Sequence, residues 1–61
     1  MYTYQIKLAH KELNRPAVVI INADTQKIGI RLACFLLLSN LGVQHTRDEY
    51  NKITVQSVQK Q

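Results

Sequence analysis

The sequence predicts a small α+β protein with the element order β-β-α-β, in which a three-stranded sheet packs against one apolar helix. Three observations predict this fold: an alternating segment at the start of the chain, a short segment that is apolar on both faces, and a long apolar run from Ile28 to Leu41. With 61 residues, the chain is expected to form a single domain over 1–61 that self-associates through its helix.

The first strand is expected over 2–9, where aromatic and aliphatic residues alternate with polar ones. This period of two is typical of a strand with one buried face. Because Tyr2 and Tyr4 share that face with Ile6 and Leu8, we expect both tyrosines in the core and not on a surface that stacks on bases. The polar segment from His10 to Pro16 ends in Asn-Arg-Pro, which indicates the loop of an antiparallel hairpin.

The second strand is expected over 17–23, with the sequence AVVIINA. It is apolar on both faces, which is typical of strands that are covered on both faces. This pattern favours either a central place in the sheet or pairing across an interface. The strand orders 2-1-3 and 1-2-3 both remain open.

The helix is expected over 25–40, with Asp24 or Thr25 as its N-cap and Gly42 as a left-handed residue after its end. Gly29 in the helix interior costs about 1 kcal/mol relative to Ala, so either something packs closely there or the cost is tolerated. A polar loop over 45–50 and a third strand over 51–58 follow. If the second and third strands share a sheet, the helix between them makes them parallel through a right-handed crossover.

The apolar residues of the helix form two arcs, since successive residues are about 100° apart. The first arc is expected to cover the sheet and contains Ile28, Leu32, Phe35 and Leu36. The second arc is expected to be an oligomer interface and contains Ile30, Ala33, Cys34, Leu37, Leu38 and Leu41. A homo-oligomer, with a dimer favoured, follows from this second arc, because a small chain with a single cysteine has no disulfide to stabilise it. The alternative is a different helix phase, with Lys and Arg stems covering the second arc.

The formal net charge of +4, from eight Lys and Arg against four Asp and Glu, favours acidic partners. The start of the helix is the candidate binding site for an anion or an acidic partner, with Thr25, Lys27 and Arg31 as its residues. The alternative, which is favoured, is that Asp24 occupies the helix start itself and that the two bases form a solvated edge.

No catalytic residue, cofactor or metal site is expected, and the chain is not expected to be an enzyme. His10 and His45 are expected to be exposed loop residues without metal-ligand spacing. Cys34 is expected to be a buried thiol with no base beside it. The adjacent acids Asp48 and Glu49 are expected to be solvated and do not form an acid/base pair.

A cytoplasmic location is expected, because no signal peptide is recognisable and one unpaired cysteine fits a reducing compartment. The apolar run is too short for a membrane span, which needs about 20 residues. The functional expectation is a small non-enzymatic binding or regulatory protein, an inhibitor or adaptor of the kind that phages and mobile elements often carry. The alternative is binding of nucleic acid or of a phosphorylated small ligand such as a nucleotide, through the basic edge at the helix start.

Overall fold

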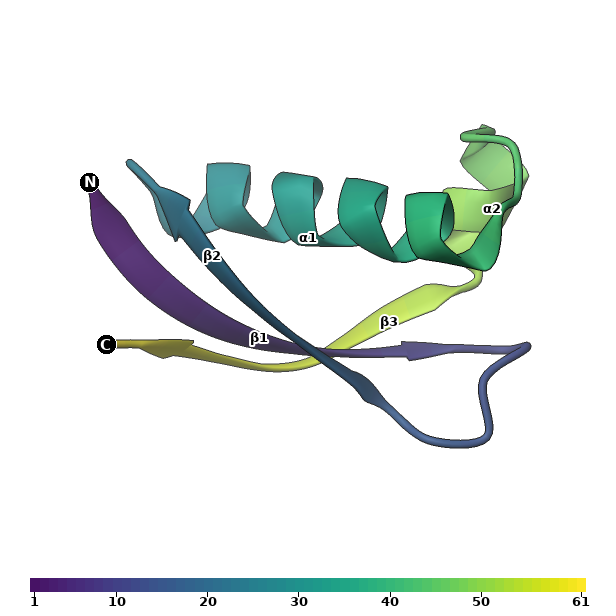
Figure 1. Cartoon of the computed structure of the whole chain (residues 1–61), viewed down its shortest axis with the longest axis horizontal. Coiled ribbons are helices and arrows are strands. Elements are labelled where there is room, and N and C mark those ends of the chain that lie inside the picture. Colours follow the sequence, from purple (N-terminus) through teal and green to yellow (C-terminus); the bar gives the residue numbers. More distant parts are fainter.

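The computed structural model describes all 61 residues and contains three strands and two helices (Figure 1). The elements are β1 (Tyr2–His10), β2 (Ala17–Ala23), α1 (Gln26–Leu41), α2 (Arg47–Asn51) and β3 (Ile53–Lys60). The strands form one antiparallel sheet, and α1 lies across one of its faces (Figure 1). The expected small α+β architecture is confirmed.

β1 is the central strand of the sheet, whose order is β2-β1-β3. It pairs antiparallel with β2, with Tyr2 opposite Ala23, and antiparallel with β3, with Tyr4 opposite Lys60. β2 and β3 therefore run in the same direction on opposite sides of β1. A central place for β2, one of the two positions that its apolar sequence favours, is wrong, and β2 is an edge strand.

The core lies between β1 and α1. Its buried side chains are Tyr4, Ile6, Leu8, Ala23, Ala33 and Leu37. α1 lies close to the sheet at Gly29, where a Cβ atom would lie 3.3 Å from Cδ2 of Tyr4 and 3.6 Å from Cβ of Ala23. Of the two alternatives for this glycine, close packing is the one that the structure shows.

The assignment of the two arcs of the helix is wrong, because α1 presents the opposite arc to the sheet. In the arc predicted as an interface, Ala33, Leu37 and Leu38 are buried. The remaining members of that arc, Ile30, Cys34 and Leu41, are half-buried and pack against the core. The physical reason is side-chain size: Gly29 and Ala33 let the helix backbone approach β1, and only the face that carries them can do so.

The ends of α1 agree with the expected capping. The Thr25 hydroxyl accepts a hydrogen bond from the backbone N–H of Ile28 at 3.2 Å, which identifies Thr25 as the N-cap. Gly42 has a φ of 73°, and its N–H donates to the carbonyl of Leu38 at 3.1 Å. The helix begins and ends one residue later than the expected 25–40.

The expected loop over 45–50 is wrong in its second half, where the short helix α2 forms. Its N-cap is Thr46, whose hydroxyl accepts a hydrogen bond from the backbone N–H of Glu49 at 3.3 Å. A threonine followed three residues later by a glutamate is the sequence pattern of a capping box. β3 consequently starts at Ile53, two residues later than expected.

Candidate protein-interaction surface

The solvent-facing side of α1 carries a continuous apolar surface, here called the outer stripe. Its four members are Ile28, Leu32, Phe35 and Leu36, and each is between 42% and 51% exposed. The spacing of i, i+4, i+7 and i+8 places them on one helix face. Their combined exposed area is on the order of 400 Å², a size at which apolar patches on small proteins often mark interaction sites.

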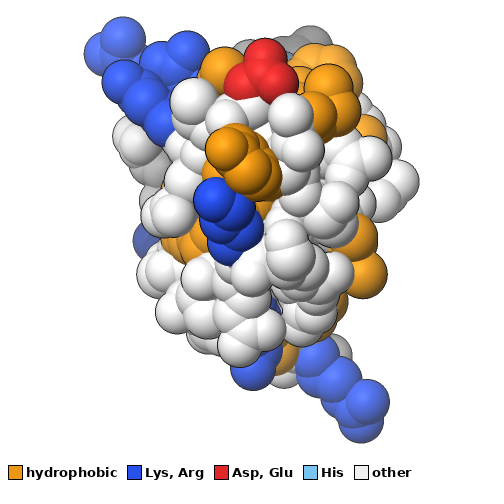
Figure 2. Space-filling model, turned by 90° about the vertical axis from the view of Figure 1, so that its left-hand side faces the viewer, with side chains coloured by type: hydrophobic (Ala, Val, Ile, Leu, Met, Phe, Trp, Pro, Cys, Tyr) orange, Lys and Arg blue, Asp and Glu red, His pale blue; other side chains and the backbone are white.

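Positive charge borders the outer stripe. Lys27 and Arg31 are both exposed and lie one turn apart on the same flank of α1. No residue of α1 is acidic, so nothing on the helix itself neutralises them. Figure 2 shows the end of the molecule where α1 starts, with Lys and Arg side chains projecting on several sides and acidic side chains in one small group. The surface therefore combines an apolar centre with a basic border.

A group of polar contacts lies at the C-terminal end of the outer stripe. The ring of His45 lies against the ring of Phe35, with a centroid distance of 4.4 Å. The same histidine is 3.2 Å from the Ser39 hydroxyl through Nε2 and 3.1 Å from the Tyr50 hydroxyl through Nδ1. These contacts connect α1 to α2 and hold Phe35 in place on the surface. His45 is exposed, as expected.

The residues predicted to form an anion site are only partly brought together. Lys27 and Arg31 share one flank, but the hydroxyl of Thr25 already accepts the N–H of Ile28. Asp24 is exposed beside the helix start, where one of its carboxylate oxygens lies 3.9 Å from the amino group of Met1. The structure thus assigns Thr25 a capping role and leaves the two bases as a border of the outer stripe.

Cys34 is half-buried on the sheet-facing side of α1, and burial raises the pKa of its thiol. A raised pKa keeps the thiol protonated at neutral pH and lowers its nucleophilicity. Three residues of the predicted interface arc, Ala33, Leu37 and Leu38, are buried within the chain, and the others pack against its core.

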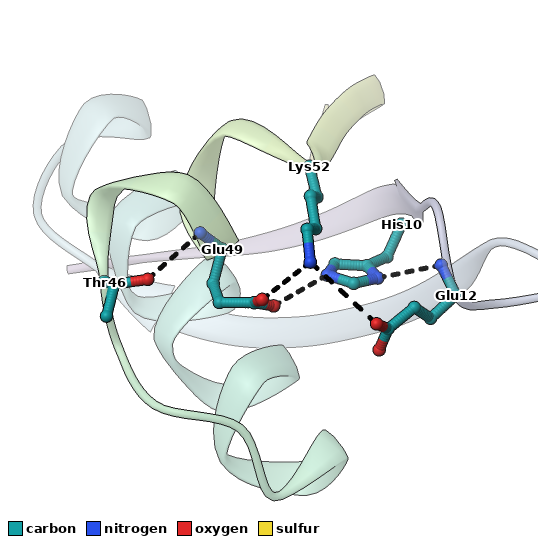
Figure 3. Close-up of polar contacts among 5 residues, drawn as sticks. All are labelled: His10, Glu12, Thr46, Glu49 and Lys52. Atoms are coloured by element: carbon teal, nitrogen blue, oxygen red, sulfur yellow. Dashed lines mark hydrogen bonds and ion pairs between the residues drawn. The ribbon is translucent and has the colours of Figure 1, made fainter.

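His10 is buried, with 4% of its surface exposed, and the expectation of an exposed loop histidine is wrong. It is the last residue of β1 and continues the buried alternation of Tyr4, Ile6 and Leu8. Around it lie Glu12, Glu49 and Lys52 (Figure 3), which together with His10 form the His10 cluster. The signal in the sequence was the alternation itself, which extends one step beyond Leu8.

The strongest contact in the His10 cluster is the ion pair between Lys52 Nζ and Glu49 Oε1, at 2.7 Å. The hydrogen bond from Lys52 is the largest influence on Glu49 and lowers the pKa of its carboxyl, and the same bond raises the pKa of Lys52. Nδ1 of His10 accepts the backbone N–H of Glu12 at 3.1 Å, which leaves its proton on Nε2. That nitrogen is 3.7 Å from Glu49 Oε2, beyond hydrogen-bond range. The cluster connects α2 to the ends of β1 and β3.

No pocket is found on the surface, and no three His, Cys, Asp or Glu side chains come together as a metal site. Neither helix is long and apolar enough to cross a membrane. Comparison with protein-family models, with curated proteins and with solved structures finds no match.

Proposed function

We propose that this chain is a non-enzymatic binding protein, an inhibitor or adaptor, that binds a larger protein through the outer stripe of α1 and also self-associates. The observation that supports the proposal is the presence of four large apolar side chains on one exposed helix face. An amphipathic helix that presents such a row is a recurrent mode of protein recognition, in which the row occupies a hydrophobic groove.

Phe35 is the expected centre of this contact. It is the only aromatic member of the outer stripe and is 51% exposed, while His45 supports one side of its ring. Aromatic anchors that are already held in place lose little conformational entropy on binding and contribute disproportionately to affinity. We therefore expect truncation of this side chain to weaken binding more than truncation of Leu36.

The border of the outer stripe defines the chemistry of the target. Lys27 and Arg31 are complementary to carboxylates around an apolar groove, and the net charge of +4 favours approach to an acidic surface. The target is thus a protein with an apolar groove that has an acidic rim. Charge at the rim acts mainly on the association rate, which should fall as salt rises.

A capture experiment in the source cell tests this function. Proteins that bind the wild-type chain should be lost with Phe35→Asp and retained with Thr54→Asp, which adds the same charge at an exposed position of β3. Retention of the same proteins by Phe35→Asp would contradict a role for the outer stripe.

The alternative function is binding of nucleic acid or a nucleotide through the basic flank, and it rests on Lys27 and Arg31. It predicts a gel shift, or a nucleotide-dependent rise in melting temperature, that weakens log-linearly with salt. The same assays with Lys27→Gln and Arg31→Gln decide whether such binding uses this flank.

A further inference from the structure

We propose that two copies of this chain associate through the outer edges of their β2 strands, antiparallel about a twofold axis at Ile20. The two three-stranded sheets then become one six-stranded sheet, with both copies of α1 on the same face. This inference gives the self-association in the proposed function a specific geometry, and it does not use the outer stripe.

β2 is an open edge. All of its seven residues pair with β1, from Tyr2 opposite Ala23 to Leu8 opposite Ala17, and no strand pairs with its other side. Its sequence contains no proline and no charged residue between Ala17 and Ala23. Proteins usually protect an exposed edge with charges, prolines or bulges, because an unprotected edge pairs readily with another strand.

β3, the other edge, carries the protection that β2 lacks. Its pairing with β1 is irregular between Lys7 and Leu8, where the register shifts by a bulge. Lys60 is the last residue of β3 and Lys52 precedes its first residue, while the middle of the strand contains Gln56 and Ser57. Bulges and edge lysines both oppose edge-to-edge pairing, so the expected contact between two copies is at β2.

Two of the three exposed side chains of β2 are apolar, and the third is Asn22. Val18 and Ile20 point to the face of the sheet that α1 does not cover, and they are 55% and 64% exposed. Across the proposed contact, Ile20 would lie opposite Ile20 of the other copy, and Val18 would lie opposite Asn22. Burial of β-branched side chains in cross-strand pairs stabilises a sheet by several tenths of a kcal/mol per pair.

The alternation of the strand restricts the register. Residues opposite each other in an antiparallel pair point to the same face, so Ile20 has to meet a residue of the same face. Full overlap of two Ala17–Ala23 segments satisfies this condition, because it places Ala17 opposite Ala23 of the second copy and Ile20 opposite its own equivalent. This register aligns all seven residues of the two strands and also places Val19 opposite Ile21 of the second copy.

Charge complementarity supports this register. Arg15 lies two residues before β2 and Asp24 lies one residue after it, and both are exposed. Antiparallel overlap brings the Arg15 end of one strand to the Asp24 end of the other. The twofold axis creates this pairing twice, whereas a parallel arrangement would place like charges together.

The joined edge would bring the strands and the helices of the two copies together. A strand of seven residues is about 24 Å long and a sheet layer is about 10 Å thick, so strand pairing would bury roughly 240 Å² of each copy. α1 packs on both Tyr4 of β1 and Ala23 of β2, so the two helices would lie side by side above the joined edge.

Ile20→Lys tests the interface directly, since it would place two ammonium groups opposite each other at the axis. Light scattering at micromolar concentrations should give a dimer for the wild-type chain and a monomer for Ile20→Lys. Gln59→Lys is the matched control, because it adds the same charge at an exposed position of β3 and should remain dimeric. A monomeric wild-type chain, or a dimeric Ile20→Lys, overturns the proposal.

Cross-linking gives an answer even if Ile20→Lys does not fold. In a Cys34→Ala background, Ile20→Cys should form a disulfide between copies when diamide takes up the two electrons of the thiols. The Cα atoms of directly opposed residues are about 4.5–5.5 Å apart, which is within disulfide range. Asn22→Cys, about 14 Å from its equivalent by the strand rise, should remain monomeric under the same oxidation. Equal cross-linking of the two variants contradicts the register.

Target binding through the outer stripe and association of two copies through β2 can be disproved independently of each other. Phe35→Asp should remain a dimer, because the outer stripe lies away from the β2 edge. Loss of the dimer in Ile20→Lys with target capture retained supports both proposals. Loss of the dimer in Phe35→Asp would instead place the contact between copies on the outer stripe and overturn pairing at β2.

Discussion

Both faces of α1 are apolar, but one packs on the sheet and the other, the outer stripe, is exposed to solvent. The buried face carries Gly29 and Ala33 at its centre, and the outer stripe carries only large side chains. A helix packs close to a sheet where its side chains are small, because dispersion contacts fall off steeply with distance. Side-chain size, and not apolar character alone, therefore decides which face of this helix meets its own sheet.

The largest expected effect is on the buried face. Leu38→Ala removes a fully buried side chain and should lower the free energy of unfolding by about 2–5 kcal/mol. Leu36→Ala, the matched change on the outer stripe, should lower it by less than about 1 kcal/mol. Urea unfolding followed by circular dichroism measures both. Equal losses would mean that the two faces are not distinguished as described.

A second substitution tests the close approach of the helix. Gly29→Leu should destabilise the fold by about 1–3 kcal/mol, because even its Cβ would be 3.3 Å from the ring of Tyr4. Asn40→Leu is the control, since Asn40 is exposed on the same helix and leucine has the higher helix propensity. The melting temperature should fall for Gly29→Leu and not for Asn40→Leu. An unchanged melting temperature of Gly29→Leu would rule out tight packing at this point.

The N-cap sets where α1 begins and so contributes to which face of the helix packs on the sheet. Thr25→Ala should cost about 1 kcal/mol, because the N–H of Ile28 loses its acceptor. Thr25→Ser keeps the hydroxyl and should retain most of the stability. If added phosphate stabilises the wild-type chain and not Thr25→Ala, the residue has a ligand-binding role in addition to capping.

The smallest effect concerns the pH dependence of the Glu49–Lys52 pair, which belongs to the cluster that connects α2 to the ends of β1 and β3. The pKa of Glu49 is lowered in the folded state, so its contribution is present above the ordinary value of 4.5 and is lost as the pH falls through the lowered value. The pKa of Lys52 is raised, so its contribution is present below 10.5 and is lost as the pH rises through the raised value.

Glu49→Gln should therefore reduce the acid sensitivity of the melting temperature below about pH 4.5 and leave the neutral-pH fold intact. Melting scans from neutral to acidic pH measure this slope. Asp48→Gln is the control, because Asp48 is an exposed neighbour on α2. An identical acid slope for Glu49→Gln and the wild-type chain would contradict the lowered pKa.

Much of the fold is predictable from local patterns. The alternation of β1, the apolar run of β2 and the capping residues Thr25 and Gly42 predict their elements to within about a residue. Apolar character does not predict which arc of α1 faces the sheet, because both arcs are apolar. The spacing of Gly29 and Ala33, four residues apart, is the signal that separates them.

The candidate surface is also only partly predictable. The sequence predicts one helix face for the chain's own sheet and another for a partner, but the face that packs on the sheet is the one predicted for the partner. α2 and the burial of His10 depend on signals that are present in the sequence, the capping pattern at Thr46 and the alternation that ends at His10. The ion pair between Glu49 and Lys52 depends on α2 and could not be predicted without it.

The central place of β1 has a consequence for the kinetics of folding. β1 can form a hairpin with β2 across a short loop, but its pairing with β3 joins residues as distant in sequence as Tyr4 and Lys60. Contacts between distant residues require a large loss of chain entropy before they stabilise anything, and they slow folding. We expect the hairpin and α1 to form first and β3 to join last, so that substitutions in β3 change the unfolding rate more than the folding rate.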